Sequence, residues 1–544
     1  MVMEACDIWK MENQQKTYLL LGCALFISMV YWSSPYETHH ASITMDQRPS
    51  FVLILTDDQD VVLEGLRPMQ HTKKLVAQQG LTLTNAFVAS PLCCPSRSSI
   101  LTGQYVHNHY AINNSLSGQC NGQRWRDGPE KKTFAAHLHY AGYQTLYAGK
   151  YLNQYGHAAA GGLSHVPPGW DWWLGLEGNS RYYNYSLSVN GSKETHGSHP
   201  DHDYLTKVIW QYALDFLAQL STHPFLMVLA PPAPHAPFIP EPKYATNFSS
   251  IKAPRTPNFN VKVSKEKHWL LRQGKQILPD EVVVKIDRVF QARLRTLLTV
   301  DDMVKDVVEK LEALNRLDNT FVIFTSDNGY HLGQFSQPLD KREPYETDIR
   351  VPLIMRGPDI PKGHLLSYPT TNVDLAPTLL DLASLPIPKY MDGTSLKPIL
   401  THSVANYDQT QNEVREVGRH DPKQLRRTVL VEHNGEGAVK HPGCENLSSG
   451  VSGCNPDFAC KCEDSWNNTY ACLRQLSPHE DRLFCQWADD EDFEEAYDLT
   501  RDPWQLNNTV ASLPPSLHKK LHNLLRNLQR CRGPRCSDLA GFVV

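Results

Sequence analysis

Two apolar runs, far apart in this chain, each end in side chains that carry oxygen ligands. The runs are residues 51–55 and 321–325. The polar side chains that follow them are Asp57, Asp58, Asp327 and Asn328. Short apolar runs of this kind predict strands buried on both faces, as in a parallel sheet covered by helices. Such sheets collect ligands beyond the carboxyl ends of their strands, so we expect the four polar side chains to meet there.

These four side chains form a candidate metal site. Three carboxylates and one amide oxygen are hard ligands that suit a divalent cation such as Ca2+. Taken alone, either pair is equally well explained by an Asx turn or a helix cap. The segment described next favours the metal site.

The segment CCPSRSSILTG, residues 93–103, carries the most specific signal. It fits, position for position, the pattern Cys-x-Pro-Ser-Arg, three variable residues and Leu-Thr-Gly. This pattern resembles the signature of the sulfatase family, in which the first cysteine is oxidised after translation to the aldehyde formylglycine. The resemblance therefore implies that Cys93 becomes the catalytic nucleophile. For a cysteine pair alone, simple burial or one half of a disulfide is the alternative.

The resemblance to sulfatases extends over residues 48–400. It includes LTDDQD, GYQTLYAGKYLNQYG, TSDNGYHLGQFS and DKREPYETDIRVPL. Within the family, these segments most resemble enzymes that act on the 6-sulfate of N-acetylglucosamine in heparan or keratan sulfate. That substrate is therefore an expectation from resemblance. The alternatives are another glycan or aryl sulfatase, and an inactive glycan-binding member of the family.

The resemblance implies a role for each candidate residue. Calcium would be held by Asp57, Asp58, Asp327 and Asn328, with the modified cysteine beside it. Arg97 would orient the aldehyde hydrate, and Lys150 would contact the hydrate or the sulfate. His235 and Lys341 would face the sulfate and the leaving oxygen, one of them as general acid. An ordinary histidine pKa of about 6.5 would leave much of His235 protonated at acidic pH, which suits proton donation.

One position departs from the family pattern. Many sulfatases carry a histidine two residues after the lysine that matches Lys150, but this chain has Leu152 followed by Asn153. His109, in the HNH run after the cysteine segment, and Asn153 are the candidates to replace it. The alternative for His109 is a histidine that packs against the first helix.

Sulfate ester hydrolysis explains the need for an aldehyde. Its hydrate carries two hydroxyls on one carbon, so one can attack sulfur while the other later loses a proton and lets the carbonyl re-form. A serine has no second hydroxyl. The expected partners are a sulfated glycosaminoglycan as substrate and, during biosynthesis, a formylglycine-generating enzyme.

Charge excludes some functions. The 544-residue chain has a formal net charge of −5, so it has no basic field for nucleic acid, and we expect no nucleic-acid partner. An acidic glycan would instead meet a local basic pocket.

The N-terminus predicts entry into the secretory pathway. Residues 18–32 form an apolar run that is short for a membrane span, so residues 1–47 are expected to be a signal peptide or an uncleaved signal anchor with a leader. Lysosomal delivery is the prediction, with secretion or a type II membrane anchor as alternatives. N-glycosylation sequons support this route. They lie at Asn113, Asn184, Asn190, Asn247, Asn446, Asn467 and Asn507.

Cysteines concentrate near the C-terminus, as expected in an oxidising compartment, and predict up to four disulfides whose pairing is open. They are Cys444, Cys454, Cys460, Cys462, Cys472, Cys485, Cys531 and Cys536. Cys94 and Cys120 either pair or stay free. The spacing of Cys460 and Cys462 lacks matching histidines for a zinc site.

Alternating strand-like and helix-like segments predict an α/β fold. We expect an alkaline-phosphatase/sulfatase-like, mainly parallel sheet between helices over residues 48–403. A polar linker or surface loop at 404–427 and a Cys-rich α+β subdomain at 428–544 should follow. Helices are expected at 68–80, 292–314 and 373–385. The basic stretch 252–290 predicts a lid or a solvated loop, and Trp170–Trp173 either a sugar platform or core packing.

Overall fold

The computed structural model describes residues 47–273, 276–401, 427–436, 451–452, 458 and 464–544. Residues 45–544 form one compact unit. The expected leader and the 404–427 linker, each except its last residue, lie outside the described residues, as do Asn446 and four of the C-terminal cysteines. Among the helices that the structure does describe, none is both long and apolar enough to span a bilayer.

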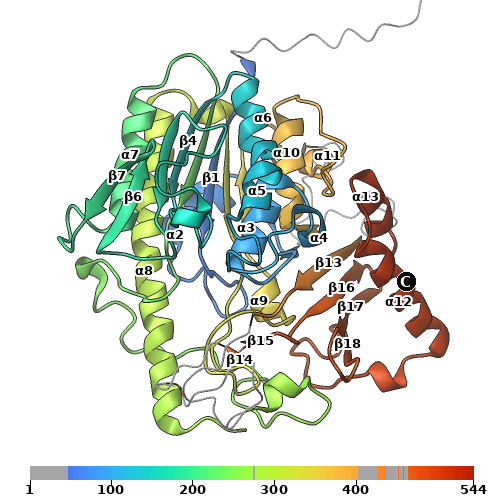
Figure 1. The fold of residues 1–544 in the computed structure, drawn as a ribbon. Helices are drawn as coiled ribbons and strands as arrows, with labels where there is room; N and C mark the ends of the chain where they lie inside the picture. Colours follow the sequence, from blue (N-terminus) through green and yellow to red (C-terminus); the bar gives the residue numbers. More distant parts are fainter. Residues whose placement is uncertain (1–46, 274–275, 402–426, 437–450, 453–457, 459–463) are drawn as a thin grey trace, which may run out of the picture. The chain divides into compact units, whose positions relative to one another are not determined.

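A ten-stranded sheet runs through the centre of the described chain (Figure 1). Its strands, in spatial order, are β11 (His364–Leu366), β2 (Leu81–Leu83), β10 (Leu353–Arg356), β9 (Thr320–Ser326), β1 (Ser50–Thr56), β8 (Phe225–Ala230), β4 (Gln144–Gly149), β5 (Trp172–Leu176), β6 (Tyr185–Val189) and β7 (Ser192–His196).

The central strands of this sheet are parallel and its flanks are mostly antiparallel. β9, β1, β8, β4 and β5 all run in one direction, whereas β10, β6 and β7 are antiparallel to their inner neighbours. In the β1–β9 register Phe51 lies opposite Phe321, and Thr56 opposite Ser326. Both strands therefore end at the same level, and the acidic residues that follow them become neighbours. The expected mainly parallel sheet is confirmed in its centre.

Helices cover both faces of the sheet because β1 is apolar on both sides. Phe51 and Leu53 face one core with α3 (Cys93–Thr102), α6 (Phe134–Tyr140) and α10 (Leu375–Leu382). Val52 and Ile54 face the other core with α7 (Leu205–Ala218) and α8 (Asp280–Ala313). Figure 1 shows the two groups of helices on opposite sides of the strands.

The predicted helices are present with shifted ends. Residues 68–80 form α2 (Gln70–Thr72), which continues into a π-helical turn at Lys73–Ala77. The helix expected at 292–314 starts earlier, at Asp280, and ends at Ala313. Besides 3-10 turns, the other short helices and strands are α4 (Val106–His109), α5 (Gln123–Asp127), α9 (Glu346–Ile349), α11 (Lys397–Thr401), β3 (Ala86–Phe87), β12 (Thr370–Thr371), β14 (Val451–Ser452) and β15 (Asp464–Ser465).

The centre of the basic stretch 252–290 packs against the C-terminal part of the chain through hydrogen bonds. Lys267 is buried and donates hydrogen bonds to Tyr497 Oη (2.6 Å) and the Gln505 carbonyl (2.6 Å), and His268 N donates to Glu495 (3.0 Å). These partners belong to the C-terminal part of the chain. Lys267 and His268 are therefore not solvated, whereas Lys262 and Lys265 are exposed as in a solvated loop, and the lid stays a prediction.

The tryptophan cluster packs in the core. Trp173 is fully buried, and its ring lies about parallel to Tyr147, with centroids 5.1 Å apart. Its indole N–H donates to Tyr155 Oη (2.6 Å). Of the two hypotheses for Trp170–Trp173, core packing holds for this ring.

A four-stranded antiparallel sheet forms the C-terminal part. Its strands are β13 (Arg427–His433), β16 (Tyr470–Ser477), β17 (Glu480–Trp487) and β18 (Glu494–Asp498). One face packs under leucines of α12 (Pro515–Leu528), with α13 (Pro534–Ala540) beside it. The other face contributes Val429, Val431 and Trp487 to the core that contains β1. The expected small disulfide-bearing subdomain is confirmed, and it shares a core with the large sheet.

Three disulfides link described cysteines. They are Cys94–Cys120, Cys472–Cys485 and Cys531–Cys536. The first resolves an alternative that the sequence left open. Cys93 is the free cysteine among the described residues.

Candidate active site

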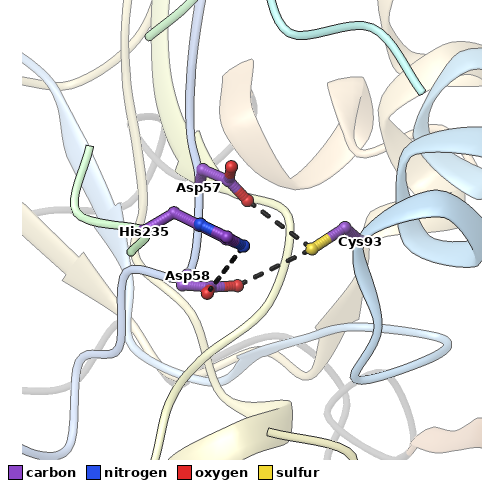
Figure 2. Close-up of side chains that lie close together, drawn as sticks. All are labelled: Asp57, Asp58, Cys93 and His235. Atoms are coloured by element: carbon purple, nitrogen blue, oxygen red, sulfur yellow. Dashed lines mark hydrogen bonds and ion pairs between the residues drawn. The ribbon is translucent and has the colours of Figure 1, made fainter. Parts of the chain in front are cut away.

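The acidic residues that follow β1 and β9 meet as the register requires. Asp58 has a left-handed backbone (φ 65°), which Asp tolerates better than most residues. Its N–H donates to Asp327 Oδ1 (2.9 Å), and its carbonyl accepts from Arg293 Nη2 (2.7 Å). This turn brings the side chains of Asp57 and Asp58 to the same side, where Figure 2 shows them facing Cys93 and His235.

Cys93 begins α3, directly opposite the two carboxylates. Its Sγ lies 3.6 Å from Asp57 Oδ1 and 3.7 Å from Asp58 Oδ1 (Figure 2). The side chain is fully buried, and burial raises the pKa of the thiol far above its usual value. A thiol held neutral in this way is a poor nucleophile, because the thiolate is the reactive form.

The rest of the cysteine segment anchors α3. Ser96 Oγ donates to the Asp327 carbonyl and accepts from Asn372 Nδ2 (2.8 Å). Gly103 caps the helix in the left-handed region (φ 67°), and a Cβ there would approach Pro377 and Ala376 within 3.2 Å. The Pro-Ser-Arg and Leu-Thr-Gly parts of the pattern therefore position the cysteine.

Arg97 ties three segments together. Its Nε donates to Asp327 Oδ2 (2.8 Å), and its Nη1 donates to the Lys150 carbonyl (2.7 Å). Nη2 lies 3.7 Å from Asp57 Oδ1 and has no hydrogen-bond partner although it is buried. Arg97 therefore keeps the N–H groups of Nη2 without an acceptor inside the cluster.

Two buried lysines each hold one carboxylate. Lys150, after β4, donates to Asp57 Oδ2 (2.7 Å), and Lys341, before α9, donates to Asp58 Oδ2 (2.7 Å). Burial would raise the pKa of Asp57, but the charge of Lys150 and neighbouring cations holds it well below its usual range. Burial would also raise the pKa of Asp58, but nearby cations, with Lys341 the largest contributor, lower it. Both aspartates are therefore held ionised.

His235 lies in the loop after β8. Its Nδ1 bonds to the Ala236 carbonyl (2.7 Å), so Nε2 faces Asp58 Oδ2 at 3.8 Å. Burial lowers the pKa of His235 to about 4, although Asp57 and Asp58 oppose this shift. The expectation that an ordinary pKa leaves this histidine protonated at acidic pH is therefore wrong, because burial penalises the charged ring.

The cluster fits a hard divalent cation. Ligand atoms of Asp57, Asp58, Cys93 and His235 lie within 4.8 Å of one another. Asn328 Nδ2 donates to Asp58 Oδ1 (2.8 Å), which leaves Asn328 Oδ1 buried without a partner. A buried oxygen without a hydrogen bond is costly, and a cation would satisfy it.

Asp327 is the most constrained of the acidic residues. Oδ1 accepts from two backbone N–H groups, those of Asp58 and Asn328, and Oδ2 accepts from Arg97. Burial nevertheless raises its pKa to about 6. Asp327 therefore already organises the site as a hydrogen-bond acceptor.

The candidates for the missing histidine lie in different surroundings. His109 is buried, with Nε2 3.0 Å from Ser99 Oγ and Nδ1 accepting from Ala111 N (3.1 Å). Burial lowers its pKa to about 3, which is the environment of a packing histidine. Leu152 belongs to the hydrophobic core. Asn153 is buried with a free Oδ1 and donates to Asn179 Oδ1 (3.4 Å).

Two contacts of the site were not expected from the sequence. Ser180 Oγ donates to Asp57 Oδ2, and Arg293 holds the Asp58 carbonyl. Ser180 lies in a loop without a recognisable pattern. Arg293 sits in the predicted long helix, where a buried arginine on an apolar face is the signal that could have identified it. Next to Ser180, a cavity of about 920 Å³ is lined by residues 177–181, Asn184 to Ser186 and Thr195 to Gly197.

Comparisons with known proteins agree with this geometry. The family model described as "Sulfatase" matches residues 49–385. The chain belongs to the sulfatase family. It is 47% identical over 494 residues to N-acetylglucosamine-6-sulfatase of Homo sapiens, covering 90% of this chain and 86% of that protein. It is 41% identical over 360 residues to an extracellular sulfatase homologue of Drosophila melanogaster, covering 65% and 31%.

A solved structure shares the fold. It holds a protein in complex with its substrate D-glucosamine-2-N,6-O-disulfate, with a TM-score of 0.69 and 23% identity over 90% of this chain and 98% of that one. The predictions of family, fold and a sulfuric ester hydrolase are confirmed.

Proposed function

We propose that this sulfatase removes the 6-sulfate from terminal N-acetylglucosamine in heparan or keratan sulfate. One observation carries the catalytic part of this proposal: a free, buried Cys93 lies within 3.7 Å of two ionised carboxylates at the start of α3. The substrate part is supported by the relatives named N-acetylglucosamine-6-sulfatase, which match 90% of this chain.

Cys93 as a thiol is a poor catalyst, and this supports its conversion to formylglycine. Its raised pKa keeps sulfur protonated beside Asp57 and Asp58. An aldehyde hydrate in the same place would supply one hydroxyl to attack sulfur and a second to let sulfate leave. Asp57 Oδ1 and Asp58 Oδ1, both near Sγ, are placed to accept hydrogen bonds from such hydroxyls.

A divalent cation, proposed to be Ca2+, would be held by the oxygen atoms at the ends of β1 and β9, where it would stabilise charge on sulfate oxygens. The proposed ligands are Asp57, Asp58, Asp327 and Asn328, next to the modified Cys93. Three permanent cations face the three carboxylates in the cluster. With the divalent cation added, the cluster has a net positive charge that attracts a sulfate ester.

The basic residues have separate proposed tasks. Lys150 and Arg97 fix Asp57 and Asp327 and so orient the nucleophile. His235 and Lys341 both approach Asp58 Oδ2, at 3.8 and 2.7 Å, from the side that is not fully buried. Lys341, which stays protonated, is the better candidate to protonate the leaving alcohol; His235, with its Nδ1–H on the Ala236 carbonyl, could donate from Nε2 only in its charged form. Asn153, with its free Oδ1 near the loop that holds Ser180, is our candidate for the position of the missing histidine.

We propose a secretory route to the lysosome. Three disulfides support an oxidising compartment. The sequon residues Asn184, Asn190, Asn247 and Asn507 are exposed, as glycosylation requires.

The test combines mass spectrometry with a substrate panel. The peptide carrying Cys93 from secreted protein should be lighter than its thiol form, and the Cys93→Ser variant should fold but lose turnover. Purified protein should release sulfate from 6-sulfated N-acetylglucosamine faster than from 4-sulfated N-acetylgalactosamine. An unmodified thiol throughout an active sample would overturn the catalytic proposal, and the reverse preference would overturn the substrate.

A further inference from the structure

A second cluster of metal-ligating side chains lies in the C-terminal part, outside the active site. Glu494 at the start of β18 meets His518 and His522 of α12. His518 Nε2 lies 2.7 Å from Glu494 Oε2, and His522 Nε2 lies 2.7 Å from Oε1. The two Nε2 atoms are 3.2 Å apart. Four donor atoms therefore converge on one point.

The surroundings hold these side chains in place. His518 and His522 are one turn apart, so they project from the same face of α12. Both rings pack edge-on against the buried Phe484, with centroids 6.0 and 5.3 Å away. The Glu494 carbonyl accepts from Asn508 Nδ2 (2.9 Å). The cluster is thus built on a helix and a strand that share one apolar core.

Hydrogen bonds alone do not satisfy this geometry. If each histidine donates its Nε2–H to its own carboxylate oxygen of Glu494, neither ring has a proton or lone pair left on that atom. The 3.2 Å contact then brings two donors against each other. A shared cation removes the conflict, because both nitrogens and the carboxylate then present lone pairs to the same centre.

We propose that Glu494, His518 and His522 bind a zinc ion. Tetrahedral Zn2+ with ligands at about 2.0–2.1 Å places neighbouring ligand atoms about 3.3 Å apart, which matches the Nε2–Nε2 separation, and the two Nε2–Oε contacts would open from 2.7 Å when the ion binds. Imidazole favours zinc over calcium, which takes six to eight oxygens. The side chain of His518 is 37% exposed, so water can reach a fourth position. The ion would tie α12 to β18.

Metal titration of the full-length secreted protein tests this site. The protein is stripped with a chelator, returned to excess Ca2+ to keep other oxygen sites occupied, and titrated with Zn2+ by calorimetry. Wild type should bind one more equivalent of zinc than the His518→Asn/His522→Asn variant. Glu494→Gln, which keeps the side-chain shape but removes a ligand charge, should weaken zinc binding by at least the roughly 10–100-fold that loss of a partner outside the ligand set costs. The matched control is His479→Asn, an exposed histidine in the β16–β17 turn, which should bind as wild type.

A spectroscopic measurement identifies the ligands. Substitution with Co2+ should give a visible absorption band in wild type and in His479→Asn that is absent from Glu494→Gln and from the double variant. Sulfatase turnover, which does not involve these residues, should be unchanged and reports that the variants are folded. Equal zinc stoichiometry and affinity in wild type and Glu494→Gln would overturn the proposal, whatever the outcome for the active site.

Discussion

Removing the Cys94–Cys120 disulfide should destabilise the protein more than removing either of the other described disulfides. The bond closes a loop with a sequence separation of 26, compared with 13 for Cys472–Cys485 and 5 for Cys531–Cys536. A cross-link restricts the unfolded chain more when the loop is longer. All six cysteines are fully buried, so the cost of the cavity left by alanine should be similar at each site.

The expected magnitudes follow from loop length. Chain entropy assigns about 3.5 kcal/mol to the 26-residue separation at 25 °C, about 3 kcal/mol to 13 residues and about 2 kcal/mol to 5 residues. Alanine is the appropriate replacement because a serine hydroxyl at these buried positions would lack a partner. The first variant is therefore Cys94→Ala/Cys120→Ala.

Urea unfolding followed by tryptophan fluorescence measures the effect. Trp125, fully buried five residues after Cys120, is one of the 11 tryptophans that contribute to this signal. The free energy lost is the shift in midpoint multiplied by the urea dependence. Thiol counting under denaturing, non-reducing conditions checks that the remaining disulfides stay formed.

The two other double-alanine variants are the controls. Equal losses for the three bonds, or the largest loss at Cys531–Cys536, would refute the chain-entropy reasoning. Such a result would mean that native-state packing around each sulfur, rather than loop length, decides the stability.

Three further outcomes are expected. His107 Nδ1 lies 2.8 Å from Glu432. Burial lowers the pKa of His107, but the hydrogen bond to Glu432 and its charge outweigh burial and raise the pKa. Its contribution is therefore present at acidic pH and lost as pH rises through the raised pKa, so His107→Gln should cost about 1 kcal/mol more at pH 5 than at pH 8 in thermal unfolding. Arg293→Met should lower the free energy of unfolding by about 3–5 kcal/mol, because it leaves the Asp60 carboxylate buried and unpaired. It should also reduce turnover, because the Asp58 carbonyl loses its hydrogen bond. Arg293→Lys should retain part of the stability and part of the turnover. Calcium chelation should abolish turnover reversibly, and Mg2+ should restore it poorly because Mg2+ demands a smaller octahedral site; full activity in chelator would contradict the metal site.

The parts of the site that follow strand ends were predictable from sequence. Asp57 and Asp327 came together because both follow apolar strands, and parallel strands in register end at one sheet edge. Cys93 followed from a spaced pattern whose serine, arginine and glycine have identifiable structural tasks. These inferences depend only on the spacing of residues within short segments and on the rule that parallel strands in register end at the same edge of a sheet.

Other features depend on contacts between distant segments. The protonation of His235 is set by burial, which no local pattern reveals, and Ser180 reaches Asp57 from an irregular loop. Lys267 looked like a solvated charge, but the rings of Phe335 and Tyr345, and of Tyr497 in the C-terminal part, enclose it at 4.2–4.5 Å. Its burial could not be deduced without knowing how the small sheet packs.

The complete enclosure of Cys93 limits when it can be chemically altered. In the folded chain its exposed fraction is 0%, because it is the first residue of α3 and faces the ends of β1 and β9. A modifying enzyme needs to grip several residues around its target, which here form the first turn of a packed helix. If the proposed oxidation occurs, it must precede the docking of that helix. A molecule that folds with Cys93 still a thiol would then stay unable to hydrolyse sulfate esters, because the residue could no longer be oxidised.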